Sequence, residues 1–155
     1  MIFKLLFFSL LFFSSINCSG SKEMNESDYE INIIEINSWL NLMPGGPGSF
    51  HLSGELEIHS NPENVVIDLN IKEIIVYSGE QLLYRFKPVF QYSRTEPDYS
   101  LNNKKIDVYQ FFTERGLEIR EVLMGNNLIN VELILVIEEK EQVKMFNDIE
   151  VTRAY

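Results

Sequence analysis

Apolar and polar residues alternate along most of the chain after residue 28, a pattern that is typical of β-strands with one buried face. The alternation is clearest in segment 50–60, and segment 128–137 is almost continuously apolar. From these two segments we expect the following side chains to be buried together: Phe50, Leu52, Leu56, Ile58, Leu133 and Leu135. Residues that favour strands, such as isoleucine, valine and phenylalanine, are abundant throughout.

Turn-forming residues divide this pattern into about eight strands. The predicted segments are 29–39, 50–60, 65–77 as one bulged strand or two short ones, 82–90, 106–113, 117–124, 128–137 and 143–155. The apolar face changes near Ile33, which predicts a β-bulge, and residues 78–81 predict a hairpin turn. Segment 117–124 also fits a helical turn, but we expect a strand there. Segment 128–137 is expected to be central and covered on both sides.

The number and spacing of these strands resemble those of immunoglobulin-like domains. The resemblance implies an all-β fold, an antiparallel β-sandwich of about eight strands over residues 29–155. A small closed barrel is the alternative. The chain lacks the cysteine pair of antibody domains, since Cys18 is its only cysteine. A sandwich supports many functions and therefore does not select one.

The first residues have a different composition. Lys4 precedes an apolar run from Leu5 to Phe13, and small or polar residues then lead to Cys18. This order of charge, apolar run and cleavage zone is that of a secretory signal peptide. The run is about half of the roughly 20 residues that a membrane-spanning helix needs.

The sequence Ser15-Ile16-Asn17-Cys18 resembles the lipobox of bacterial lipoproteins, in its relaxed spirochaete-like form. The usual leucine is replaced by Ser15, and the usual glycine or alanine by Asn17. The resemblance implies a signal peptide at 1–17 and acylation, including palmitate, of Cys18. Residues 18–28 are then a polar tether between the lipid and the domain. An ordinary secreted protein with a chance cysteine is the alternative.

The charge of the chain limits its partners. Removal of residues 1–17 takes away Lys4 and no acid, which leaves 12 basic and 23 acidic residues and a formal charge of −11. Such a surface repels nucleic acid, so we expect no nucleic-acid partner. The membrane is expected to be reached through the lipid anchor, in the bacterial cell envelope. Segment 82–115 alone carries a net charge of +2, with six basic and four acidic residues.

Two irregular stretches are the candidate partner-binding loops, since rigid scaffolds present function on loops. One is rich in glycine and proline, and the other is the polar segment 91–105 with the basic residues. The candidate residues are Met43, Pro44, Gly45, Gly46, Pro47, Gly48, Arg94, Lys104 and Lys105. A phosphate-binding loop is excluded for the first stretch, because a strand rather than a helix is expected to follow it.

Both histidines fall on the polar face of segment 50–60, together with Glu55 and Glu57. His51 and His59 are about 26 Å apart along a strand, too far to share one metal ion. Glu55 and Glu57 are about 6.6 Å apart, as in any strand with alternating acids. No Gly-x-Ser-x-Gly or His-Glu-x-x-His motif occurs. We therefore expect no catalytic residue, metal site or cofactor.

These observations favour a non-enzymatic envelope lipoprotein whose domain binds a protein or glycan partner or scaffolds an assembly. A small exported hydrolase is the alternative from another class, and its base would have to be His51 or His59. A carrier of an apolar ligand is a third possibility, which would need a cavity between the sheets.

Overall fold

The computed structural model describes residues 29–60, 68–97 and 105–155 of the chain. These residues form eight strands and one short helix: β1 (Tyr29–Asn41), β2 (Ser49–Ser60), β3 (Leu69–Ser78), β4 (Gln81–Phe86), β5 (Val89–Pro97), β6 (Lys105–Phe112), α1 (Val122–Gly125), β7 (Leu128–Ile137) and β8 (Lys140–Ala154). The prediction of an all-β chain is thereby confirmed.

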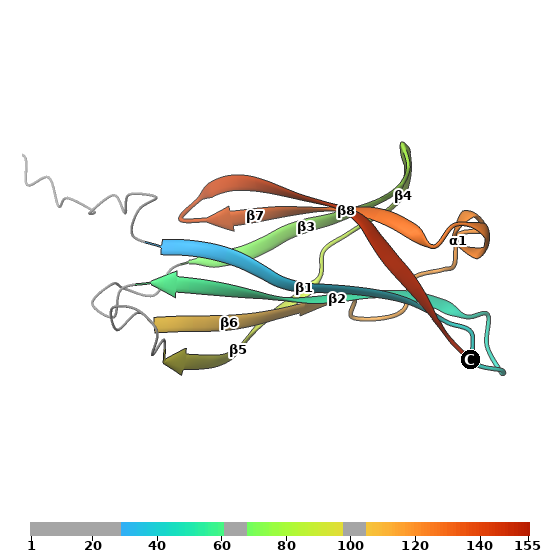
Figure 1. The fold of residues 1–155 in the computed structure, drawn as a ribbon, viewed down its shortest axis with the longest axis horizontal. Coiled ribbons are helices and arrows are strands. Elements are labelled where there is room, and N and C mark those ends of the chain that lie inside the picture. Colours follow the sequence, from blue (N-terminus) through green and yellow to red (C-terminus); the bar gives the residue numbers. More distant parts are fainter. Residues whose placement is uncertain (1–28, 61–67, 98–104) are drawn as a thin grey trace, which may run out of the picture.

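The strands form one sheet in the order β4-β3-β7-β8-β1-β2-β6-β5 (Figure 1). The sheet folds over, so that β3, β4 and β7 face β1, β2, β5 and β6, and β8 passes from one half to the other. All pairs are antiparallel except β1 and β8, which run parallel over four residue pairs from Ser38↔Val151 to Asn41↔Ala154. The sheet is therefore mixed, whereas an antiparallel arrangement was predicted.

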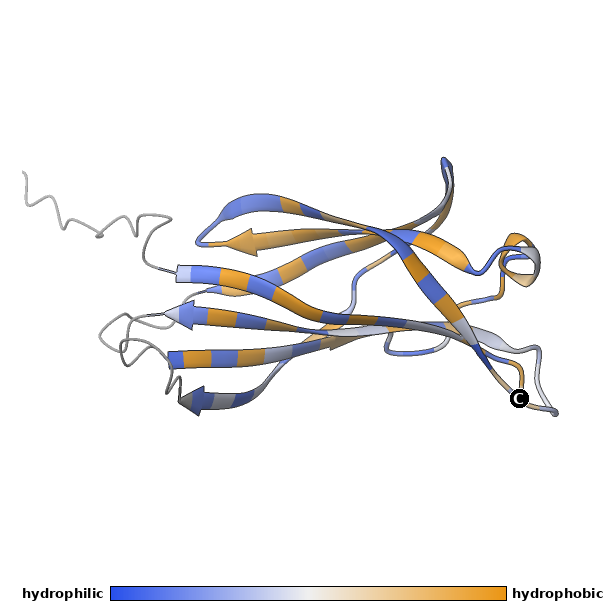
Figure 2. Cartoon of the chain, viewed as in Figure 1, coloured by the Kyte–Doolittle hydropathy of each residue, from blue (hydrophilic) through white to orange (hydrophobic). Residues whose placement is uncertain are grey.

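The core lies between the two halves and consists of the alternate residues of the strands. Figure 2 shows the alternation as orange and blue bands along β2 and β6, whereas β7 is mostly orange. All six side chains predicted to be buried together have an exposed fraction of 2% or less and belong to one cluster. The strand registers predicted for segments 50–60 and 128–137 are confirmed.

Other local predictions are also confirmed. The register of β1 against β2 shifts between Ile33 and Glu35, where a bulge was expected. The β3–β4 hairpin turns at Gly79, whose φ of 57° lies in the left-handed region that glycine adopts at low cost. The turn between β7 and β8 has positive φ at Glu138 and Glu139, as a tight hairpin requires.

Three predictions are wrong. Segment 117–124 is not a strand: Leu117 makes an isolated bridge to Phe50, and Val122 begins α1. Strand β7 is central but covered on one face only, because every second residue is partly exposed. The polar segment that begins at residue 91 is not a loop, because β5 continues to Pro97; residues 98–104 lie outside the described part.

Strand β4 also departs from its predicted register. Strict alternation over segment 82–90 would place Leu82 and Tyr84 on one face, but Leu82 is 51% exposed and Tyr84 is 7% exposed. A register shift against β3 at Val76 and Tyr77 places the neighbours Leu83 and Tyr84 in the core together. This bulge brings Tyr84 into contact with the site described below.

Gly54 is buried beside the β1 bulge, and its substitution provides a test of how closely the core is packed there. A Cβ atom at this position would lie 2.3 Å from the ring of Phe111 and 2.5 Å from the carbonyl oxygen of Glu35, which belongs to the backbone. We predict that Gly54→Ala lowers the free energy of unfolding by about 2–3 kcal/mol, measured by urea denaturation. The control is Gly46→Ala, whose Cβ would meet nothing within 4 Å. Equal stability of the two variants would contradict the packing.

Candidate functional site

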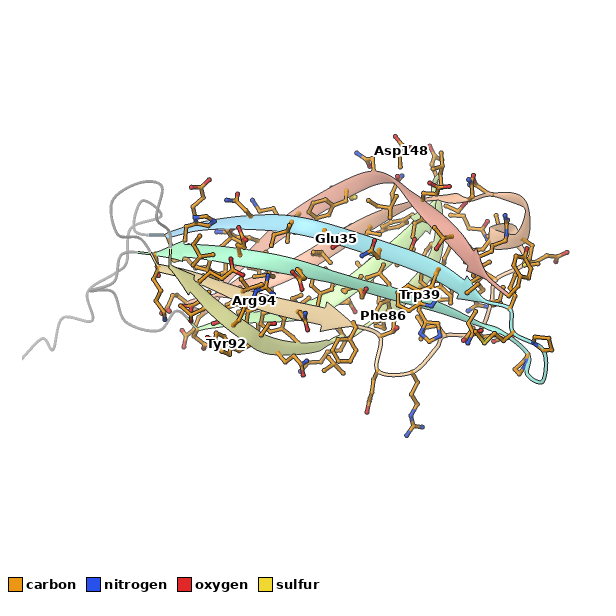
Figure 3. All side chains as sticks on the ribbon, turned by 60° about the horizontal axis from the view of Figure 1, so that its bottom comes forward. Glu35, Trp39, Phe86, Tyr92, Arg94 and Asp148 are labelled. Carbon is orange, nitrogen blue, oxygen red and sulfur yellow. The ribbon has the colours of Figure 1, made fainter. Side chains whose placement is uncertain are left out.

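The structure places the two predicted loops at opposite ends of the sheet. Strand β2 begins at Ser49, beside the glycine-proline loop, and ends at Ser60, which pairs with Lys105 of β6. These ends are about 36 Å apart along the strand. In Figure 3, Trp39 lies toward the end of the sheet with the glycine-proline loop, and Arg94 lies toward the other end. The two stretches therefore cannot form one contiguous site, although binding at either remains a prediction.

The two described basic residues of the second stretch, Arg94 and Lys105, lie on strands and are paired with carboxylates. Arg94 belongs to β5 and is paired with Glu96 and, at 3.7 Å, with Glu55. Lys105 belongs to β6 and lies 2.8 Å from Asp107. The hydrogen bond that Lys105 donates to Asp107 raises the pKa of Lys105, and the one that Arg94 donates to Glu96 raises the pKa of Arg94. Lys104 and Cys18 lie outside the described residues.

The glycine-proline loop connects β1 to β2 as a structural turn. Gly45 and Gly48 have positive φ, whereas Gly46 does not. A Cβ at Gly48 would lie 2.7 Å from the Ile119 side chain, so the loop is packed against the β6–β7 connection. Met43 is 57% exposed at its start.

Near this loop, Ser49 and His51 form a hydrogen bond of 2.8 Å between Oγ and Nε2 on the outer face of β2. The imidazole is stacked on Trp39, with ring centroids 5.1 Å apart. A Cβ on Gly116 would lie 2.5 Å from Ser49 Oγ, so the backbone of this residue covers the pair. A serine–histidine contact is what a nucleophile and base need, but no carboxylate of the described residues hydrogen-bonds to His51.

His59, the second histidine, forms a 3.1 Å ion-pair contact with Glu57 at the other end of β2. Within residues 29–60, 68–97 and 105–155, no three histidine, cysteine, aspartate or glutamate side chains gather closely enough to hold a metal ion. In the same ranges, no helix has the length and apolar character needed to cross a membrane.

The feature that sequence analysis missed is the connection between β6 and β7, residues 113–127, which crosses the end of the core. We call this end of the sheet, where β1 ends and β4 and β7 begin, the distal end, because β1 starts at the opposite end. The connection is bound first to β2, through hydrogen bonds between the backbones of Thr113 and Leu52 and of Leu117 and Phe50.

It is then bound to β3 in the other half of the sheet and to β8, which passes between the halves. Asn126 donates a hydrogen bond of 2.9 Å to Ser78 at the end of β3. Arg153 of β8 donates one of 3.0 Å to the carbonyl oxygen of Met124. Leu123 is completely buried in the core. The connection therefore closes the distal end and joins the two halves.

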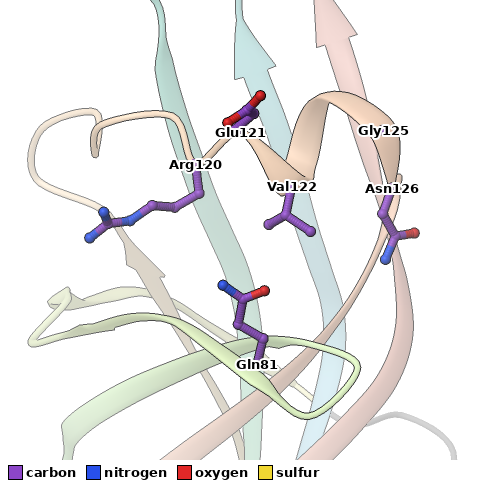
Figure 4. A pocket seen from close by; sticks show the side chains of 6 residues that line it. All are labelled: Gln81, Arg120, Glu121, Val122, Gly125 and Asn126. Carbon is purple, nitrogen blue, oxygen red and sulfur yellow. The ribbon is translucent and has the colours of Figure 1, made fainter.

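Between this connection and the β3–β4 hairpin lies an open cavity of about 580 Å³ (Figure 4). Its lining residues are Gln81, Arg120, Glu121, Val122, Gly125 and Asn126. In Figure 4 the side chains of Gln81, Val122 and Asn126 point toward the space between hairpin and helix, while those of Arg120 and Glu121 point away from it in different directions. Amides and an apolar side chain therefore face the cavity, and two opposite charges lie at its edge.

The position of Arg120 depends on Tyr84. The Tyr84 hydroxyl donates a hydrogen bond of 2.7 Å to the carbonyl oxygen of Glu118 and accepts one of 3.1 Å from the backbone amide of Arg120. The Tyr84 ring is stacked on Phe50, and the Arg120 guanidinium lies 5.9 Å above the ring centre. Burial raises the pKa of Tyr84. One core side chain therefore anchors the rim of the cavity.

Exposed apolar side chains are concentrated at the distal end. Of the nine large apolar residues that are exposed in the described part of the chain, five lie there: Met43, Leu82, Met124, Leu128 and Tyr155. Leu82 and Met124, each 51% exposed, are next in sequence to the lining residues Gln81 and Gly125. The helical spacing of Ile119, Val122 and Leu123 was the sequence signal for this site, and the strand prediction concealed it.

Comparison with known proteins adds no relative: no family model, no curated protein and no solved structure matches this chain. The function must therefore be inferred from the site itself.

If the Tyr84 hydroxyl anchors the β6–β7 connection, its removal should lower the stability of the protein. We expect Tyr84→Phe to lower the free energy of unfolding by about 1–3 kcal/mol, because the amide of Arg120 and the carbonyl of Glu118 lose their partner. The control is Tyr155→Phe, since Tyr155 is 80% exposed. Chemical denaturation measures both variants. A loss no greater than that of the control would show that the hydroxyl does not hold the connection.

His51 predicts a pH dependence. Burial lowers its pKa from the ordinary value of 6.5, so the imidazole takes up a proton less readily in the folded than in the unfolded chain. The free energy of unfolding should therefore fall as the pH drops below about 6.5 toward the lower pKa of the folded state. We expect His51→Gln to reduce this fall between pH 8 and pH 5.5 in urea denaturation. An unchanged pH profile would disprove the assignment.

Proposed function

We propose that this chain is a lipid-anchored protein of the bacterial cell envelope whose β-domain is a non-enzymatic module that binds a partner at its distal end. The observation that carries the proposal is the concentration of exposed apolar side chains at this end, where two of them, Leu82 and Met124, are next in sequence to residues that line the cavity. Exposed apolar groups rimmed by polar ones are typical of interaction surfaces. The anchor is inferred from the lipobox-like sequence at Cys18.

The position of the tether is consistent with this role. Residues 18–28 would join the lipid to Tyr29, where β1 starts, and β1 then runs to the distal end. A rigid sheet therefore separates the anchored end from the cavity by about 36 Å. A partner in the envelope would meet the end that points away from the lipid.

We also infer that the fold is an immunoglobulin-like sandwich rather than a closed barrel. Two facing halves share one apolar core, and β8 connects them by only four parallel residue pairs to β1. The two edge strands of the sheet, β4 and β5, do not pair with each other in the described residues. Both features fit a sandwich whose halves meet on one side.

One set of experiments on native envelope tests both the lipid anchor and the binding site. Mass spectrometry of the mature protein purified from native envelope should show acyl chains that are lost in Cys18→Ala. Cross-linking and pull-down from the same envelope should then capture a reproducible partner. We expect Met124→Glu to reduce capture at least tenfold, because a charge would be placed at the apolar rim.

The matched control is Met145→Glu. Met145 is 50% exposed, as Met124 is, but it lies on β8 beside Val143, away from the cavity. Circular dichroism verifies that both variants are folded. If both variants capture the partner equally well, the distal end is not the binding surface. A mature protein without acyl chains would remove the anchor from the proposal.

A further inference from the structure

We propose that the distal cavity binds an acidic and apolar segment of a protein partner, whose carboxylate pairs with Arg120. The inference rests on the proposed function and specifies the chemistry of the partner at the same site.

Arg120 has no carboxylate within ion-pair distance among the described residues. Arg85 and Lys105 are neutralised, at 3.0 Å from Glu73 and 2.8 Å from Asp107, whereas other basic side chains of the described residues, such as Arg115 and Lys144, also lack an ion pair. Arg120 differs from these in its position, because it is the one basic residue among the described residues that line the cavity. It offers a complementary charge to an acidic ligand.

The guanidinium of Arg120 is also held in position. Its backbone amide is bound to the buried Tyr84 hydroxyl, and its charged group lies above the Tyr84 ring. A planar guanidinium can bind a carboxylate through two parallel hydrogen bonds. Because the backbone of Arg120 is fixed by Tyr84, less conformational entropy is lost when the ligand binds.

The rest of the lining favours a peptide over a small acid. Val122 provides an apolar surface, which Leu82 and Met124 extend at the rim. The side-chain amide of Gln81 has no partner among the described residues and can bind a peptide group. Asn126 is already bound to Ser78 and to the amide of Leu128, so it shapes the cavity instead.

Glu121 lines the same cavity and sets a limit on the charge of the ligand. No described cation neutralises its carboxylate, which repels a second negative charge near the one bound by Arg120. The ligand that fits is therefore a segment with one carboxylate between apolar side chains, rather than a run of acids.

The test uses two synthetic peptides on the full domain after the tether, acetyl-Ser-Leu-Glu-Leu-Ser-amide and the same peptide with glutamine in place of glutamate. Titration followed by amide NMR shifts measures both affinities at physiological salt. We expect the glutamate peptide to bind about tenfold or more tightly than the glutamine peptide, with shifts at Gln81, Arg120 and Val122.

Single substitutions then identify which charged side chain causes the preference for the glutamate peptide. Arg120→Gln should abolish the preference for glutamate, and Glu121→Gln should tighten binding of the glutamate peptide. Arg115→Gln is the matched control: it removes the same charge from the same connection, at an exposed residue outside the cavity lining. It should retain the preference.

Equal binding of the two peptides, or a preference that survives Arg120→Gln, would overturn the inference. Partner capture that depends on Met124 but not on Arg120 would also overturn it, while leaving the proposed function intact. Conversely, a preference that depends on Arg120 without any captured partner would support a carboxylate site and remove the proposed function.

Discussion

The packing of the inner side chains of β2 against those of β7 is the interaction on which the rest of the structure depends. Phe50 and Leu52 on one strand, and Leu133 and Leu135 on the other, are completely buried in a shared cluster. Because each strand contributes every second residue, a shift by one position would expose the whole set. The fixed register of these two strands therefore determines which residues reach the outer faces and the ends.

The same core determines the distal cavity. Folding one sheet over on itself leaves its ends open, and the β6–β7 connection closes one of them by placing Leu123 in the core. Tyr84 then extends from the core to the rim through its hydroxyl. The ring of Tyr84 packs in the core while its hydroxyl binds the backbone of Glu118 and Arg120, so this one residue links the packing of the core to the position of the rim. The cavity is thus a consequence of how the end is closed, with Arg120 fixed as part of that closure.

Sequence periodicity predicted most strands because alternation is a local property that records which face is buried. Periodicity failed where contacts between residues distant in sequence determine whether a segment forms a strand. Residues 91–97 are polar and lack alternation, yet they form β5, because an edge strand can be held by ladder pairing and ion pairs such as that of Arg94 with Glu55. Arg94 and Lys105 are neutralised mainly by acids two residues away, Glu96 and Asp107, which share a face with them because both segments are strands. The prediction of a loop at 91–105 did not place these charges side by side.

The candidate site was harder to predict than the fold for a related physical reason. Arg120, Val122 and Gln81 belong to two segments that are close only after the sheet folds over, and neither segment contains a recognisable motif. The β4 bulge that buries Tyr84 next to Leu83 breaks the alternation on which the prediction relied. A register shift costs regular ladder hydrogen bonds, and it directs a side chain to a place that strict alternation would not allow. At β4, that shift is what connects the hydrophobic core to the arginine of the cavity.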